Sequence, residues 1–499
     1  MSVLFRAITR HAQQQPEAPA LQGGGYSLTY AELVQQLQRV GGELSRAGVK
    51  ALGLLADNGV AWAVADLSAL FADILVVPLP PFFSVQQLQH AIRDSGIDAV
   101  LTDQPERVEE LLGGQCRRVE SDAYGALHIV QLVSPSTAEV PANTAKITYT
   151  SGTTGQPKGV CLSRDAMESV AQSLCNASLA SPDDRHLCLL PLSTLLENIG
   201  GIYVPLLAGA CSNVLPLREV GLQGAAALDA GQMVKSVCES HASSAIMVPQ
   251  MLHAMVAALA MGAPKPTALR FIAVGGAPVA PRLLGGAQQL GLPVYEGYGL
   301  SECASVVAVN APGCNKPGSV GKPLPHVKLK FAEDGEIKVS GAVFSGYLGQ
   351  AEHPDAEGYW PTGDIGYLDD DGYLHLTGRK KNMFITSFGR NVAPEWVERE
   401  LTIHPAIAQA AVFGEAQPWN AAVIVPRLLS GAEVQNAVAE AVAAANVNLP
   451  DYARVKKWIL ASEAFTPQNG LLTTNGRLRR NEIWSRYEAA VGKLYQEDE

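Results

Sequence analysis

The sequence predicts an α/β fold: a large N-terminal domain of helix-covered mixed or parallel sheets with a small β-barrel region, followed by a small α+β C-terminal domain. A chain of 499 residues is too long for one hydrophobic core. Strand and helix patterns alternate through the first half, which is typical of parallel sheets covered by helices. The pattern changes near residue 318 and again near residue 380. We therefore expect an N-terminal domain at 1–380 and a C-terminal domain at 381–499.

The individual elements follow from hydrophobic periodicity. Helices are expected over residues 26–49, 60–73 and 84–96, and strands over 51–57, 74–80 and 98–103. A second strand and helix series runs from 235 to 299. Asp-Gly turns between alternating residues in 318–378 predict hairpins, which would form the small β region. Beyond the predicted boundary we expect a helix at 393–404, strands at 407–414 and 421–426, and an alanine-rich helix at 431–446.

Composition limits the function classes. A net charge of −11 and a pI near 5.5 leave no general basic surface, so nucleic acid is not an expected partner. Eight cysteines without a C-x-x-C pair indicate a reduced, cytoplasmic protein. Residues 1–17 contain no signal peptide and instead suggest a short amphipathic helix. The apolar stretch 61–83 carries Asp66 and Asp73, so it predicts a buried helix and strand with no transmembrane segment, while peripheral membrane contact stays open.

One loop, TSGTTGQPKG at residues 150–159, has the chemistry of a phosphate site. Glycines allow backbone N–H groups to converge on an anion, hydroxyl side chains add donors, and Lys158 adds positive charge. The loop is not the common phosphate loop, because Lys158 follows Pro157 and precedes Gly159. A solvated loop rich in serine, threonine and glycine remains the alternative interpretation.

Four further stretches give this loop a context: GGAPVAP at 275–281, EGYGLSE at 296–302, YWPTGDIG at 359–366 and GRKKNMFITSFGRNVAPEWVE at 378–398. Each is weak alone. In this order and spacing they resemble the adenylate-forming superfamily of acyl-CoA synthetases, luciferases and adenylation domains, from SLTYAEL near residue 27 to LLTTNGRLRRNEI near residue 471. The sequences GRKKNMFITSFGRNVAPEWVE and NGLLTTNGRLRRN are most similar to the long-chain fatty acyl-CoA ligases.

The resemblance implies an enzyme, an AMP-forming acid-thiol ligase. It would join a carboxylic acid to ATP, with Mg²⁺, and then pass the acyl group to CoA or to the phosphopantetheine of a carrier protein. It implies catalytic roles for Lys158, Glu302 and Arg477, with Glu302 as metal ligand. The phosphate-binding residues would be Thr150, Ser151, Gly152, Thr153, Thr154, Gly155, Lys158 and Ser301. The adenine and ribose contacts would be Gly276, Ala277, Pro278, Glu296, Gly297, Tyr298, Asp364 and Arg379. Lys381 would be the hinge between domains, and Gly389 would border the thiol tunnel.

Ordinary structural roles compete with these assignments. Glu302 could be a surface carboxylate, Asp364 a turn residue in PTGD, and Gly389 a turn glycine. Two positions depart from the family pattern. Arg477 stands where the family has a catalytic lysine, and this exchange is not conservative in a fitted site. Thr194 stands where long-chain relatives tend to carry histidine.

The stretch LPLSTLLENIGG at 190–201 is the candidate acyl pocket, with Thr194, Leu195, Ile199 and Gly200 as its lining. These residues favour a fatty or other hydrophobic acid, although a plain buried helix explains the leucines equally well.

Three functions remain open from the sequence: an acid–CoA ligase, an acyl-AMP ligase that loads a carrier protein, and a nucleotide- or acyl-binding protein that has lost catalysis through Arg477. The flanks of Lys158 disfavour an ordinary P-loop NTPase.

Overall fold

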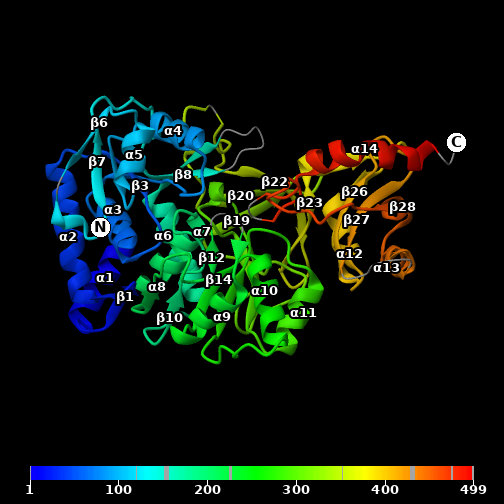
Figure 1. Cartoon of the computed structure of the whole chain (residues 1–499), viewed down its shortest axis with the longest axis horizontal. Helices are drawn as coiled ribbons and strands as arrows, with labels where there is room; N and C mark the ends of the chain where they lie inside the picture. Colours follow the sequence, from blue (N-terminus) through cyan, green and yellow to red (C-terminus); the bar gives the residue numbers. More distant parts are fainter. Residues whose placement is uncertain are drawn as a thin grey trace.

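The computed structural model describes residues 2–119, 121–150, 157–223, 227–350, 352–427, 433–473 and 476–496. It contains two large sheets, a four-stranded antiparallel sheet and a three-stranded sheet, with helices between and around them (Figure 1). The predicted α/β class is confirmed.

The first large sheet is mixed, with parallel pairing at its centre because β3 pairs with both β4 and β5 in the same direction. Its eight strands occur in the order β21 (Gly346–Tyr347), β9 (Lys158–Ser163), β8 (Thr144–Thr150), β4 (Leu75–Pro78), β3 (Ala51–Leu55), β5 (Ala99–Thr102), β7 (His128–Leu132) and β6 (Cys116–Val119).

The second large sheet has a parallel centre and antiparallel edges. Its nine strands occur in the order β18 (Lys322–Pro323), β17 (Ala308–Val309), β16 (Val294–Tyr298), β15 (Phe271–Val274), β14 (Ser244–Met247), β10 (Arg185–Leu187), β11 (Cys211–Asn213), β1 (Pro19–Gly23) and β2 (Tyr26–Thr29).

Helices connect these parallel strands, as the alternating sequence pattern predicted. The larger ones are α1 (Val3–Gln14), α2 (Tyr30–Arg46), α3 (Val60–Phe71), α4 (Val85–Asp94), α6 (Arg164–Ala177), α9 (Ala230–Glu239), α10 (Pro249–Ala260) and α11 (Pro281–Gln289). The shorter elements are α5 (Pro105–Leu111), η1 (Asp122–Tyr124), α7 (Leu195–Glu197), the π-helix η2 (Asn198–Tyr203), α8 (Val204–Ala208), η3 (Ser301–Cys303) and the hairpin β12 (Leu222–Gln223) with β13 (Ala227–Leu228). One core cluster joins residues of both large sheets to α1, α2, α3 and α6.

The first predicted helix begins later than expected, because 26–29 forms strand β2. Thr29 ends this strand and caps α2: its side chain accepts the Glu32 backbone N–H, while the Glu32 carboxylate accepts the Thr29 N–H. The capping box therefore fixes the start of the helix at Tyr30. The stretch 61–83 forms the buried helix α3 and strand β4, as expected. No helix among the described residues has the length and apolar character needed to cross a membrane.

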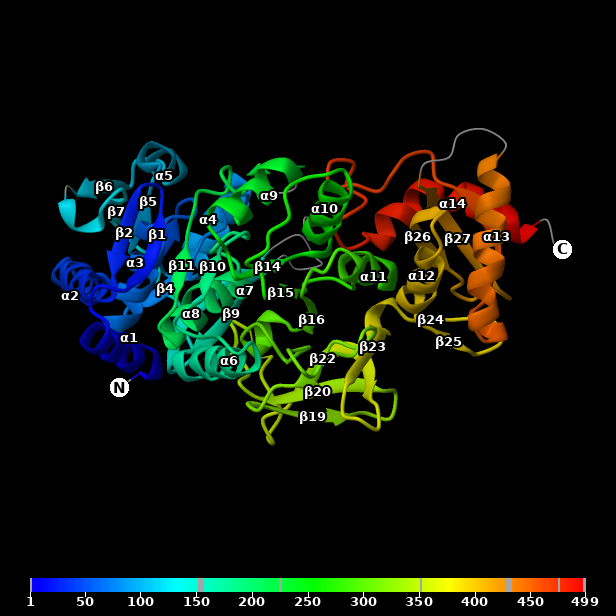
Figure 2. The ribbon, with the colours of Figure 1, turned by 90° about the horizontal axis from the view of Figure 1, so that it is seen from below.

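The turn-rich segment forms a four-stranded antiparallel sheet where a small barrel was predicted. Its order is β19 (Val327–Phe331), β20 (Glu336–Gly341), β22 (Trp360–Leu368) and β23 (Leu374–Arg379). Figure 2 shows β19 and β20 to one side of the large sheets.

The elements after β23 gather at the end of the molecule opposite the N-terminus (Figures 1 and 2). They are η4 (Lys380–Asn382), β24 (Phe384–Ile385), β25 (Asn391–Val392), α12 (Pro394–Ile403), β26 (Ile407–Phe413), β27 (Asn420–Pro426), α13 (Glu433–Asn448), η5 (Asp451–Ala453), β28 (Val455–Leu460) and α14 (Arg480–Gln496). Strands β26, β27 and β28 form one sheet, and two separate core clusters pack on it.

Candidate active site

A cavity of about 1030 Å³ lies where the large sheets, the four-stranded sheet and the C-terminal elements meet. Many of the predicted site residues, far apart in the sequence, line it together. They are Thr150, Thr194, Leu195, Gly200, Gly276, Gly297, Tyr298, Ser301, Glu302, Arg379 and Arg477. The tertiary structure thus combines the predicted phosphate, adenine and acyl segments in one continuous space.

The predicted phosphate loop connects two neighbouring strands. Thr150 is the last residue of β8 and Lys158 the first of β9, and the two are partners in the antiparallel ladder. Five of the predicted phosphate-binding residues lie outside the described part of the chain, together with Gln156: Ser151, Gly152, Thr153, Thr154 and Gly155. What the structure places is therefore the two ends of the loop, with Thr150 on the cavity wall.

Lys158 and Glu302 are brought together by a residue that the sequence did not indicate, Tyr347. The Tyr347 hydroxyl donates a hydrogen bond to Glu302 Oε1 at 2.6 Å, and Lys158 Nζ lies 4.7 Å from the centre of the same ring. Lys158 also approaches Glu352 Oε2 at 3.6 Å. Tyr347 reaches this place because strand β21 pairs with β9, next to Lys158. Nothing in SGYLG distinguishes this tyrosine from an ordinary loop residue.

Asp364 is held by two other predicted residues. It is the ladder partner of Arg379, and Arg379 Nε lies 2.6 Å from Asp364 Oδ1. The Tyr298 hydroxyl donates to Asp364 Oδ2 at 2.7 Å. Burial, and then the nearby Asp364 charge, raises the pKa of Tyr298, so this hydroxyl stays protonated and remains a donor. The carboxylate keeps lone pairs for further donors, since each of its oxygens can accept two hydrogen bonds.

Arg477, from the C-terminal elements, contacts the predicted adenine segment directly. Its Nε and one terminal nitrogen donate to the Gly276 carbonyl at 3.0 and 2.8 Å. Gly276 adopts a φ of +83°, in the left-handed region that favours glycine. Lys381 lies near the same cations: burial, then Arg379 and Arg477, lower its pKa. Several positive groups therefore surround one end of the cavity, as a polyanionic ligand would require.

The cavity wall also contains buried hydroxyl groups that lack partners among the described residues. Thr148 Oγ1, Ser193 Oγ and Ser305 Oγ make no hydrogen bond there, and all three residues line the cavity. Buried polar groups are normally paired, so orphaned hydroxyls on a cavity wall favour a polar ligand. Glu302 fits a magnesium ligand by the same reasoning, because Tyr347 is the one described side chain bonded to it and carboxylate oxygen is what Mg²⁺ prefers.

Comparison with known proteins decides the family. The model of the AMP-binding enzyme family matches residues 8–360, and the model of the AMP-binding enzyme C-terminal domain matches residues 381–499. The chain belongs to the AMP-binding enzyme family. The predicted superfamily and the prediction of an enzyme are therefore confirmed.

Curated relatives of this AMP-binding enzyme carry several substrate names. A long-chain-fatty-acid–CoA ligase of Mycobacterium bovis is 26% identical, covering 98% of this chain and 96% of the relative. A feruloyl-CoA synthase of an Amycolatopsis species is 31% identical over 84% of this chain and 87% of the relative. A 2-succinylbenzoate–CoA ligase of Bacillus licheniformis is 30% identical over 83% and 87%.

Solved structures agree on the fold. An anthranilate CoA ligase in complex with anthranoyl-AMP has a TM-score of 0.81 at 19% identity, and covers 97% of both chains. An o-succinylbenzoate CoA synthetase of Bacillus subtilis with its acyl-adenylate intermediate has a TM-score of 0.73 at 25% identity, covering 96% of this chain and 97% of the other.

Other predicted residues of this AMP-binding enzyme lie away from the cavity wall. Ile199, within the predicted acyl segment, is fully buried in a hydrophobic core cluster. Gly389, with a φ of +69°, lies in the exposed turn between β24 and β25, as the turn interpretation expected. Glu296 receives the Val279 N–H at 3.3 Å, and burial raises its pKa to about 7. Ala277 and Pro278 lie in the loop that enters α11.

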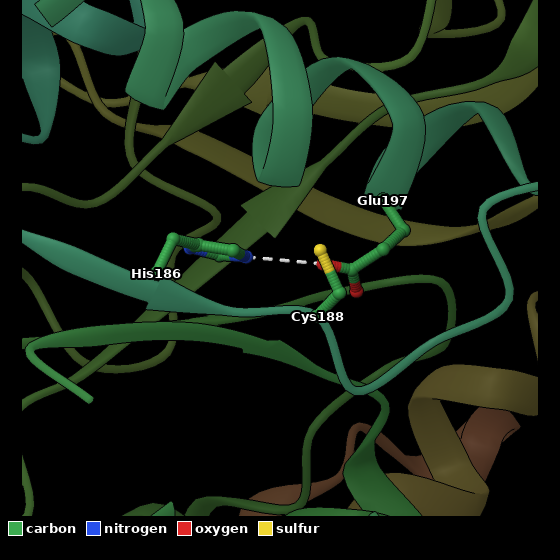
Figure 3. Close-up of side chains that lie close together, drawn as sticks. All are labelled: His186, Cys188 and Glu197. Carbon is green, nitrogen blue, oxygen red and sulfur yellow. Dashed lines mark hydrogen bonds and ion pairs between the residues drawn. The ribbon is translucent and has the colours of Figure 1, made fainter. Parts of the chain in front are cut away.

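A second polar cluster lies beside the predicted acyl segment, and none of its three residues is among the predicted site residues. His186, Cys188 and Glu197 are buried, with potential metal-ligand atoms within 4.8 Å of one another. Figure 3 shows His186 and Glu197 joined directly, Nε2 to Oε1 at 3.0 Å. Burial, then Glu197, raises the pKa of Cys188 well above its ordinary value, and the other two members already have hydrogen-bond partners: His186 bonds to Ser244 and Glu197, and Glu197 accepts the Leu190 N–H. We therefore interpret the cluster as a hydrogen-bonded network.

Proposed function

We propose that this enzyme activates a hydrophobic carboxylic acid with ATP to form an acyl-AMP, and then transfers the acyl group to the thiol of CoA. The observation that carries the proposal is the continuity of the cavity. One cavity is lined both by the predicted nucleotide segments and by apolar side chains of the acyl segment and of the second large sheet, such as Leu195, Ile246 and Phe271. An acid seated on the apolar side would present its carboxylate to the nucleotide side.

The first step requires charge and alignment. A carboxylate is ionised at neutral pH and needs no general base to become a nucleophile. It must approach the α-phosphate of a polyanion, so positive groups must offset the repulsion and hold the reactants in line. Arg379 and Arg477 lie on the cavity wall and Lys158 at its edge, which suits this task. Glu302 would hold magnesium, which when bound supplies further positive charge to the phosphates.

The second step would use a different arrangement of the C-terminal elements. We propose that residues 381–499 form a separate domain, and two observations support this: its core clusters contain only residues from 384 onward, and its family model begins at 381. Lys381 then lies at the hinge, and rotation there would withdraw Arg477 from Gly276 and admit the pantetheine arm past Gly389. All eight cysteines are free thiols, which suits a cytoplasmic location.

A carrier-protein phosphopantetheine presents the same thiol as CoA, so the acceptor is tested directly. The test is a panel of carboxylic acids scored by AMP release, with CoA or with a holo carrier protein as acceptor. We expect hydrophobic acids and CoA to give thioester. A thioester formed only with the carrier protein would contradict CoA as acceptor.

Pyrophosphate exchange tests whether the enzyme is active at all. Acid-dependent exchange is expected for acyl-AMP formation. Its absence with every acid would instead support a binding protein that lost catalysis at Arg477, and a panel led by small polar amino acids would overturn the hydrophobic substrate class.

A further inference from the structure

The floor of the acyl side is one face of the second large sheet, and its rows follow from strand register. Ser244 is the ladder partner of both His186 and Phe271, and Ile246 is the partner of Ala273. Because side chains alternate along a strand, Ser244 and Ile246 point to the same face. Both rows line the cavity. The row of His186, Ser244 and Phe271 is the one farther from the nucleotide segments, because the strands run toward Gly276 and Gly297.

The roof of this part is the acyl segment, and it touches the floor at Ile246. A Cβ atom added to Gly200 would lie 2.4 Å from Ile246 Cδ1, so glycine is required for the two to approach this closely. The cavity nevertheless continues past this contact, where Val204 and Ala210 also line it. We call the part of the cavity beyond Ile246, which is lined by the row of His186, Ser244 and Phe271, the far chamber.

The far chamber contains a chain of hydrogen bonds from Glu197 through His186 to Ser244, and the Ser244 oxygen can accept a further hydrogen bond. Glu197 can only accept when ionised, so His186 Nε2 carries the hydrogen in the bond drawn in Figure 3. A neutral imidazole then presents Nδ1 as an acceptor, and Nδ1 lies 3.0 Å from Ser244 Oγ. In the tautomer with the hydrogen on Nε2, Ser244 therefore donates to His186 Nδ1. Its oxygen lone pairs have no other side-chain partner among the described residues, on a residue that lines the cavity.

We propose that the far chamber recognises a hydroxyl group at the end of the acid opposite its carboxylate, through Ser244 oriented by His186 and Glu197. The inference rests on the proposed function, because it assumes that the acid occupies this cavity. From Val248 to Ser244 the floor extends four residues, or ~13 Å at about 3.3 Å per residue. The tail must cross Ile246 to reach Ser244, so the substrate class is the extended ω-hydroxy aliphatic acids.

The test compares acids that differ only at the far end: lauric, ω-hydroxylauric and ω-methoxylauric acid, with ferulic acid as a short hydroxylated acid. The methoxy group keeps the oxygen but cannot donate. We expect the wild-type enzyme to prefer ω-hydroxylaurate to ω-methoxylaurate by about tenfold in kcat/KM, the effect of one buried hydrogen bond. Equal values for the two acids in the wild-type enzyme would overturn the inference without any variant.

Ser244→Ala removes the acceptor, and Ser178→Ala is the matched control. Ser178 lines the same cavity, but it caps the end of α6 and lies outside the row of His186, Ser244 and Phe271, and its hydroxyl donates to the Leu174 carbonyl at 2.7 Å. We expect the ratio of kcat/KM for ω-hydroxylaurate to that for ω-methoxylaurate to fall to about one in Ser244→Ala, and to persist at the wild-type value in Ser178→Ala. A preference that survives in Ser244→Ala would refute the assignment, as would faster turnover of ferulate than of ω-hydroxylaurate.

Failure of the proposed function would look different. In that case the enzyme would release no AMP with laurate. The affinities of ω-hydroxylaurate and ω-methoxylaurate, measured by calorimetry, would still show whether the far chamber recognises the hydroxyl group.

Discussion

Replacing Arg477 with alanine removes both donors from the Gly276 carbonyl and one positive charge from the cavity wall. If Arg477 acts on the transition state of adenylation, its loss costs about 2.7 to 4 kcal/mol, the range for one stabilising donor. The rate of acyl-AMP formation should then fall by about two to three decades. Transfer of a preformed acyl-AMP to CoA should stay within about threefold, because the proposed rotation at Lys381 would withdraw Arg477 before that step.

The assay measures the half-reactions separately: pyrophosphate exchange for adenylation, and CoA consumption from synthetic acyl-AMP for transfer. Arg479→Ala is the control, since this exposed arginine lies two residues away and pairs with Glu482. Arg477→Lys should adenylate at least as fast as the wild type, because the resemblance to the superfamily implies a catalytic lysine at this position. Equal losses in both half-reactions of Arg477→Ala, or adenylation within threefold of wild type, would refute the reasoning.

Three further outcomes are expected. Tyr347→Phe removes the hydroxyl that is bonded to Glu302. The magnesium concentration that gives half-maximal adenylation should then change by about threefold, consistent with one hydrogen bond of about 0.5 to 1.5 kcal/mol. An unchanged magnesium titration would show that Glu302 does not hold the metal. Asp66→Asn leaves the buried Lys146 ammonium without its carboxylate, 2.6 Å away. The free energy of unfolding in urea should fall by about 3 to 5 kcal/mol, because a buried charge is left without its partner. A loss below about 1 kcal/mol would contradict this role of Asp66. Burial raises the pKa of Glu296 from 4.5 to about 7, so the stability that this group contributes is fully present below pH 4.5 and is lost as pH rises through about 7. The urea midpoint of Glu296→Gln should therefore depend less steeply on pH than that of the wild type across this range. Parallel pH profiles of the two proteins would contradict this role of Glu296.

Local sequence patterns predicted most of the elements because their signals are local. Alternating strand and helix periods located β3, α3, β4 and α4 to within a few residues. The start of α2 was missed because Tyr26–Thr29 continues the apolar pattern, and its pairing with β1, together with the Thr29 cap, decides the boundary. The barrel expected near 318–378 is a four-stranded sheet, since hairpin signals say nothing about how strands close.

For the candidate site, too, the sequence indicated some features and the tertiary structure decided others. The motifs and their order determined the family and named Glu302, Asp364 and Arg477, because these residue types carry the chemistry wherever the chain places them. The tertiary structure decided what touches them. Tyr347 reaches Glu302 only because β21 pairs with β9, and Asp364 meets Arg379 only through the register of β22 and β23.

The sequence by itself therefore determined the class of fold, the family and the chemical inventory of the site. Only the tertiary structure decided that the predicted nucleotide and acyl segments line one cavity, and that Ser244, with no motif around it, is bonded to His186 on the wall of that cavity. The physical reason is that periodicity and motif spacing are properties of neighbours along the chain, whereas strand register and cavity walls depend on contacts between residues far apart in it.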